Sequence, residues 1–162
     1  ATGEGIENIA RAQAAAEGIP GLAGQVAQLA RVALSSPSVR QAVSGRHWRE
    51  VYVGAEVDGK VIEGFIDLLY DTPEGLVVLD YKTDSVASDA EIDEAMTRYR
   101  LQGAVYALAL EQLAGSIGRP VAGCVFVFLR GTEARERRVN DLSAAIAEVR
   151  ARLATAGSAA VT

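Results

Sequence analysis

The chain has 162 residues, of which 49% are hydrophobic and 23% are charged, the balance of an ordinary globular domain with one core. Sixteen basic residues against 21 acidic ones give a net charge of −5, which argues against a protein that grips nucleic acid along its whole surface. The single cysteine excludes a disulfide framework and an iron–sulfur cluster held by this chain alone. Because no apolar run approaches ~20 residues and no signal-peptide pattern opens the chain, we predict a cytoplasmic protein without a membrane partner.

The first third of the chain is predicted to be helical. Apolar residues recur at helical spacing over residues 6–10 and again over 22–33. Ser36 followed by Pro37 is typical of a helix start and predicts a short third helix. We therefore expect residues 1–48 to form an N-terminal helical part of the domain.

Three strands are predicted next, over residues 49–57, 60–70 and 76–82. The Asp58-Gly59 pair between the first two is a two-residue hairpin signal, so the three strands form an antiparallel meander. The third strand carries a Leu-Val-Val-Leu run, which predicts burial on both of its faces.

The remaining elements are predicted to be a long helix, two strands and a closing helix, over 93–116, 124–129, 134–139 and 141–153. Because a long helix precedes it, the 124–129 strand is predicted to lie parallel to the third strand. The sequence thus predicts an α/β domain with a mixed β-sheet core over residues 49–153, and a flexible tail over residues 154–162.

Two aspartates and a lysine are predicted to converge on one spot of the sheet. If the turn is centred on Pro73 and Glu74, Asp67 and Asp80 face each other across the hairpin. Asp80 and Lys82 are two residues apart on one strand, so their side chains leave by the same face.

Two carboxylates among apolar neighbours are costly to bury without a cation. A hard divalent ion such as Mg²⁺, which takes oxygen ligands, is the simplest explanation for the pair. Lys82 would then orient an attacking water and neutralise developing negative charge. The alternative is an ordinary salt bridge between Asp80 and Lys82 on a solvated face.

Three motifs carry a family resemblance: Gly64-Phe-Ile-Asp67, Val78-Leu-Asp80-Tyr-Lys82-Thr83, and Tyr99-x-x-Gln102-x-x-x-Tyr106. In this order and spacing they resemble the RecB-like branch of the PD-(D/E)xK nucleases, found at the C-terminus of RecB, AddA and AdnB-type helicase–nucleases. The resemblance is close over residues 50–129, and it implies a restriction-endonuclease-like mixed sheet flanked by helices.

The resemblance also implies roles for individual residues. Asp67 and Asp80 correspond to metal ligands, together with the backbone carbonyl of Tyr81, for Mg²⁺ or Mn²⁺. Lys82 corresponds to the catalytic lysine of the family.

Gln102 and Tyr106 match the family's helical motif beside the active site and the DNA strand. Tyr99 shares their helix face, because the three residues fall at i, i+3 and i+7. A packed helix face with satisfied polar tips is an equally good interpretation of these residues. Glu50 matches a glutamate that the family often carries ahead of its first strand.

The function implied by the resemblance is a metal-dependent DNA nuclease, cutting phosphodiester bonds as part of an ATP-dependent helicase–nuclease in double-strand-break repair and recombination. Its expected partners are single-stranded DNA, a helicase motor in the same parent chain, and a second helicase–nuclease subunit. The chain has no Gly-x-x-x-x-Gly-Lys-Ser/Thr loop, so ATP would act only through that motor. The alternative is a non-cutting module of the same fold that guides DNA or docks a subunit.

One feature of the family has no counterpart here. The family carries a metal-ligating histidine on its first helix, whereas His47, the only histidine, stands at the helix-to-strand junction. The matching segment would lie just before Ala1. We therefore expect an N-terminally truncated piece, whose own metal binding and activity the missing histidine puts in question.

Overall fold

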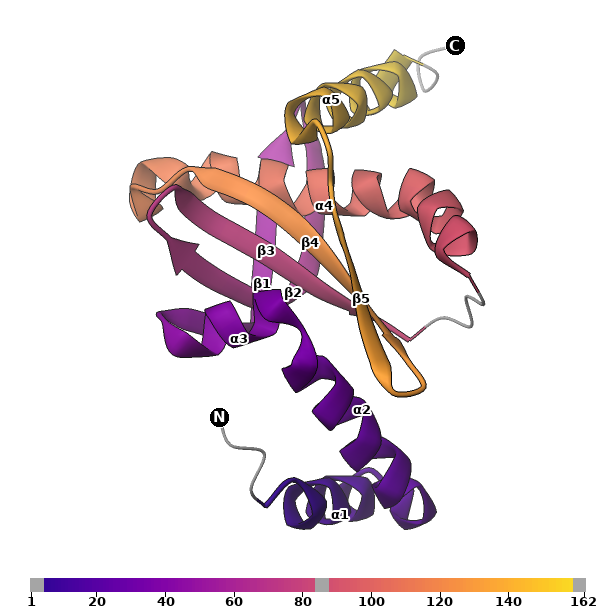
Figure 1. The fold of residues 1–162 in the computed structure, drawn as a ribbon. Coiled ribbons are helices and arrows are strands. Elements are labelled where there is room, and N and C mark those ends of the chain that lie inside the picture. The colour runs from indigo at the N-terminus through magenta and orange to yellow at the C-terminus, as the bar shows by residue number, and fades with distance from the viewer. Residues whose placement is uncertain (1–4, 84–87, 159–162) are drawn as a thin grey trace.

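The computed structural model describes residues 5–83 and 88–158, which form one five-stranded sheet with helices on both faces (Figure 1). The helices are α1 (Ile6–Ala16), a short 3₁₀ turn η1 (Pro20–Leu22), α2 (Ala23–Ser35), α3 (Pro37–Ser44), α4 (Asp89–Ile117) and α5 (Leu142–Ser158). The strands are β1 (His47–Val57), β2 (Lys60–Thr72), β3 (Gly75–Lys82), β4 (Val121–Arg130) and β5 (Glu133–Arg138). They lie side by side in chain order, so the predicted α/β fold with a mixed sheet is confirmed.

The N-terminal helices form as the sequence pattern predicts. The side chain of Ser36 caps α3 by accepting a hydrogen bond from the backbone N–H of Val39 at 3.2 Å, and Pro37 occupies the first turn. Figure 1 shows α1 packed beside α2 and away from the sheet, whereas α2 and α3 both contact the sheet.

Antiparallel pairing joins β1 to β2 and β2 to β3. Asp58 and Gly59 both have positive φ, 50° and 74°, as a two-residue hairpin turn with the twist of its strands requires. At the second turn, a Cβ on Gly75 would stand 2.4 Å from the carbonyl oxygen of Pro120, so only glycine fits there. Thr72 pairs with Gly75 and Leu68 with Leu79, which is the predicted register.

The α4 crossover places β4 parallel to β3, as predicted. Asp80 lies opposite Phe126 and Lys82 opposite Phe128 in this pairing. β5 then returns antiparallel to β4 and forms the far edge of the sheet.

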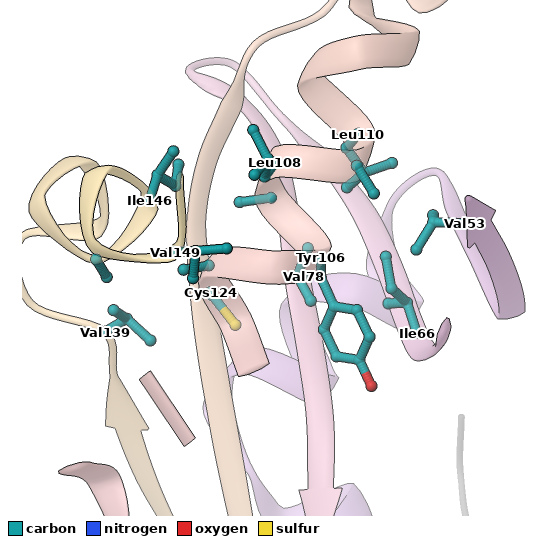
Figure 2. Close-up of a cluster of buried hydrophobic side chains, with 14 of the residues drawn as sticks. Val53, Ile66, Val78, Tyr106, Leu108, Leu110, Cys124, Val139, Ile146 and Val149 are labelled. Atoms are coloured by element: carbon teal, nitrogen blue, oxygen red, sulfur yellow. The ribbon is translucent and has the colours of Figure 1, made fainter. Parts of the chain in front are cut away.

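Two apolar cores cover the two faces of the sheet. The first lies under α4 and α5 and includes Val53, Ile66 and Val78 (Figure 2). The second lies under α3 and includes Leu68 and Leu79. β3 is buried on both faces, in agreement with its continuous apolar run.

Several boundaries differ from the predicted ones. The long helix begins at Asp89 rather than residue 93, and β1 begins at His47 because His47, Trp48 and Arg49 pair with the end of β2. The closing helix continues to Ser158, into the segment for which we expected a tail, because its alanine-rich sequence favours a helix. Among the described residues, no helix is long and apolar enough to cross a membrane.

Candidate active site

The site lies where β2 and β3 separate. Their pairing ends at Leu68 opposite Leu79. Beyond that pair, β2 stays with β1 while β3 stays with β4 as far as Lys82. Asp67 and Asp80 are therefore the first residues of the two strands past the last shared pair, at the mouth of a fork that we call the β2–β3 fork.

β2 changes face at Asp67. Ile66 packs in the core under α4, whereas Leu68 packs in the core under α3. Residues two apart on a regular strand share a face, so the alternation is broken between them. On β1, the residue at the same level is Glu50, whose φ of 50° is left-handed.

Asp67 joins the two strands across the fork. Its Oδ2 accepts a hydrogen bond from the backbone N–H of Tyr81 at 2.7 Å, replacing the ladder partner that β2 no longer supplies. Because the N–H and C=O of a strand residue point to the same edge, the carbonyl of Tyr81 also faces the fork. A carboxylate and a backbone carbonyl thus meet there.

Asp80 is buried, with 3% of its surface exposed. Its Oδ2 lies 2.7 Å from the Lys82 Nζ, and its Oδ1 accepts a hydrogen bond from the Tyr106 hydroxyl at 3.4 Å. Burial raises the pKa of Asp80 above its usual range, the ion pair with Lys82 opposes this, and the charge of Asp67 adds to it. A buried carboxylate whose pKa is shifted by burial and by specific charged neighbours is typical of a functional site.

Gln102 connects the members of the site. Its Oε1 accepts a hydrogen bond from Lys82 Nζ at 2.9 Å, and its Nε2 donates to the Tyr106 hydroxyl at 2.8 Å. The same Nε2 lies 3.5 Å from Asp80 Oδ1. One amide therefore aligns the lysine, the phenol and the carboxylate.

Tyr106 reaches the site from α4 through the core. Figure 2 shows its ring lying beside Ile66, with the hydroxyl pointing away from the apolar cluster. Burial raises the pKa of Tyr106, so the phenol stays protonated and serves as a donor. A Cβ on Gly64 would stand 2.8 Å from Cε1 of this ring, so the glycine makes room for it.

Two residues contribute to the site in ways that the sequence does not predict. Gly64 belongs to a motif but has no predicted role, although a glycine inside a strand is itself a sign of close approach by another group. Phe126 is predicted only as part of an apolar strand, yet its ring centroid lies 5.3 Å from Lys82 Nζ. Nothing in the strand's pattern distinguishes this phenylalanine from its apolar neighbours.

The two remaining predicted site residues, Tyr99 and Glu50, lie in different places. The Tyr99 ring lies over Lys82, with its centroid 4.3 Å from Nζ. Glu50 lies within β1 and is exposed, whereas the glutamate of the family stands ahead of the first strand. Within the described part of the chain, no hydrogen bond joins Glu50 to the other predicted site residues.

The donor set suits a hard divalent cation. In residues 5–83 and 88–158, no three histidine, cysteine, aspartate or glutamate side chains are grouped closely enough to hold a metal ion. Two carboxylates, of Asp67 and Asp80, and the carbonyl of Tyr81 nevertheless offer the oxygen ligands that Mg²⁺ and Mn²⁺ take together with water and substrate. His47 plays no part in this group, since its Nδ1 lies 3.1 Å from the carbonyl of Gly45.

One known protein family matches nearly the whole chain. The family model described as the PD-(D/E)XK nuclease superfamily matches residues 4–161. An ATP-dependent helicase/nuclease subunit from Bacillus pumilus is 40% identical over 73 residues, 40% of this chain and 6% of the relative. The protein of the same name from Clostridium botulinum is 44% identical over 55 residues, 34% of this chain and 4% of the relative.

A solved structure has a similar fold. An inferred exonuclease from Eubacterium rectale superimposes with a TM-score of 0.55 over 85% of this chain and 52% of its own, at 19% sequence identity. At that identity the likeness concerns the fold alone. The matches to the curated relatives span only a small part of their length, 4–6%.

Proposed function

The chain belongs to the PD-(D/E)XK nuclease superfamily, and we propose that it is a metal-dependent deoxyribonuclease domain that hydrolyses phosphodiester bonds at the β2–β3 fork. The observation that carries the proposal is the meeting of Asp67, Asp80 and Lys82 at that fork, with Asp80 buried against Lys82 at 2.7 Å. Burying this ion pair costs desolvation free energy, which its mutual attraction and hydrogen bonds have to offset. A pair kept at such a cost supports a functional role for the fork.

In this proposal Asp67, Asp80 and the Tyr81 carbonyl hold Mg²⁺ or Mn²⁺. When bound, such an ion stabilises charge on a phosphoryl oxygen and lowers the pKa of a water molecule. Lys82 orients the attacking water and neutralises the negative charge that develops on the phosphate. Its hydrogen bonds to Asp80 and Gln102 support this role, because they hold the ammonium at the fork.

The two site residues on α4, Gln102 and Tyr106, have a supporting role. Gln102 and Tyr106 donate hydrogen bonds toward Asp80 and so keep its carboxylate oriented on the side where the DNA strand would pass. Glu50, exposed on the edge strand β1 at the level of Asp67, is a further candidate for a contact with the substrate.

The relatives support a proposal for the parent protein and for the substrate. Because the matched relatives are ATP-dependent helicase/nuclease subunits, we propose that the chain is the nuclease domain of a cytoplasmic helicase–nuclease. A motor in the same parent chain, driven by ATP, would feed it single-stranded DNA, and a second subunit would complete the machine for double-strand-break repair and recombination. The net charge of −5 is consistent with a domain to which DNA is delivered.

A non-cutting module that guides DNA or docks a subunit is the second candidate. The acidic composition favours it. Carboxylates gathered at the fork would only lower stability in a protein that binds neither metal nor a scissile phosphate.

The test is degradation of a labelled single-stranded oligonucleotide with added Mg²⁺ or Mn²⁺, in the isolated chain and in the parent protein. Asp80→Ala and Lys82→Ala should each lower the rate by roughly a thousandfold, the scale of removing a transition-state charge contact. Lys60→Ala, at the other lysine, is the matched control and should leave the rate unchanged. Unchanged rates in the two site variants would reject the proposal, and DNA binding without cleavage would favour the second candidate.

A further inference from the structure

The Lys82 ammonium is enclosed by two aromatic rings as well as hydrogen-bonded. Its Nζ lies 4.3 Å from the centroid of the Tyr99 ring and 5.3 Å from that of Phe126. Both distances are within the ~6 Å over which a ring face attracts a cation. The Lys82 side chain is only 14% exposed, so little water weakens these contacts.

The two rings come from different elements and support each other. Tyr99 lies on α4 one turn before Gln102, and Phe126 lies on β4 opposite Asp80. Their centroids are 5.3 Å apart at an interplanar angle of 29°, a stacked arrangement. Phe126 is fully buried, so the stack is fixed to the core rather than free to turn.

The rings restrict the ammonium where hydrogen bonds do not. An ammonium has three N–H groups, of which one points to Asp80 at 2.7 Å and one to Gln102 at 2.9 Å. A lysine stem is flexible and its charge has no fixed direction, so two hydrogen bonds alone leave it room to move. The two rings, which lie next to each other against the ammonium, narrow that freedom further and leave one N–H for a substrate oxygen or a water.

We propose that Tyr99 and Phe126 are positioning residues that form an aromatic clamp on Lys82 and keep its ammonium at the β2–β3 fork. This inference rests on the proposed function for its catalytic consequence, although the clamp itself is a matter of geometry. It gives Tyr99, which shares the helix face of Gln102 and Tyr106, a role in holding the lysine.

The clamp is tested directly by NMR, without reference to activity. The chain has only two lysines, so a ¹³C-lysine-labelled sample gives one set of ε-methylene signals from Lys82 and one from Lys60. Protons above an aromatic face are shielded. The Lys82 signals should therefore lie upfield of those of Lys60, move back in Tyr99→Leu, and stay upfield in Tyr99→Phe. Coincident signals of the two lysines in the wild-type chain would overturn the clamp.

The catalytic consequence is tested by kinetics in the protein that cuts DNA. Tyr99→Leu should lower kcat roughly ten- to a hundredfold with KM within about twofold, because the lysine is misplaced rather than the substrate released. Tyr99→Phe keeps the ring and should keep kcat within about threefold. A loss of kcat in Tyr99→Phe equal to that in Tyr99→Leu would show that the ring is not what matters.

A matched pair in β4 separates positioning from packing. Phe126 and Phe128 are both fully buried and both contact the Tyr99 ring, with centroids 5.3 and 5.9 Å away. Of these two, only Phe126 makes a ring–cation contact with Lys82 in the described part of the chain. Phe126→Leu should therefore lower kcat more than Phe128→Leu at a similar loss of stability, and equal kcat values would contradict a direct part of Phe126 in the clamp. If the wild-type protein cuts no DNA while the Lys82 signals are shielded, the proposed function fails and the clamp stands.

Discussion

Two clusters of ion pairs lie against α4, and they differ in their burial and in the direction in which the pKa of their aspartates is shifted. At the β2–β3 fork, Asp80 and Lys82 are 5% and 14% exposed in their side chains. At the far edge of the sheet, Arg137 of β5 pairs with Asp89 and Asp93 of α4, and its partners are 53% and 63% exposed. A carboxylate and a cationic side chain thus pair inside the molecule at the fork and on its surface at the far edge of the sheet.

The aspartates of the two clusters respond in opposite directions. Burial raises the pKa of Asp80, whereas the hydrogen bond from Arg137 lowers the pKa of Asp89. The surface cluster therefore fastens the start of α4 to β5 at little cost of desolvation. The fork carries its ionisable groups in surroundings that disfavour charge, and this difference supports the catalytic role proposed for it.

The largest effect is expected from breaking the buried pair. Lys82→Met leaves the Asp80 carboxylate buried without its cation, and should lower the free energy of unfolding by about 3–5 kcal/mol. Adding Asp80→Asn should recover most of that loss. Urea unfolding of the two single variants and the double variant gives the coupling energy, and a value below about 1 kcal/mol would mean that the pair is no more than a surface salt bridge.

The second-largest loss of stability is expected from disturbing the packing around the fork. Gly64→Ala places a Cβ 2.8 Å from the Tyr106 ring and should cost about 1–3 kcal/mol by overpacking. Gly24→Ala, in α2 with open space around it, is the control and should stabilise by about 0.5–1 kcal/mol. Equal effects of the two changes on urea unfolding would contradict the close packing of Tyr106.

Breaking the surface cluster should matter less. Arg137→Gln should lower the free energy of unfolding by less than about 1 kcal/mol, because its partners face water. The difference from wild type should shrink further in 1 M NaCl, where the Debye length is only ~3 Å. A loss as large as that of Lys82→Met, unaffected by salt, would remove the distinction between the two clusters.

The smallest effect is expected from Asp89→Asn, on the stability of the chain at acid pH. Because the pKa of Asp89 is lowered in the folded chain, its stabilising contribution is present above its unfolded value of ~3.9 and is lost as the pH falls below it. Asp89→Asn should therefore flatten the decline of stability on the acid side of that value. The check is urea unfolding between neutral and acid pH, and identical slopes for variant and wild type would contradict the assignment.

Much of this arrangement follows from the sequence. The turn residues fix the register of β2 and β3, so the convergence of Asp67, Asp80 and Lys82 could be predicted from the position of the hairpin alone. The parallel placement of β4 follows from the length of the helix before it. Both features depend on local signals, the turn residues and the length of one helix, which leave few alternative arrangements of the strands.

The fork itself could not be predicted in this way. A regular strand would place Ile66 and Leu68 on one face of the sheet, whereas they lie in opposite cores. The contacts of Phe126 and Gly64 likewise depend on how α4 lies across the sheet. Such tertiary contacts leave only faint traces in a single sequence.

The most direct test of the central claim is calorimetric titration of the chain with Mn²⁺. If Asp67 and Asp80 form a metal-dependent nuclease site, wild type should bind the ion saturably, and Asp67→Asn and Asp80→Asn should each abolish or greatly weaken that binding. Arg137→Gln, which disturbs only the surface cluster, should bind as wild type does. Binding of equal strength in wild type and Asp80→Asn would contradict a metal site at the β2–β3 fork.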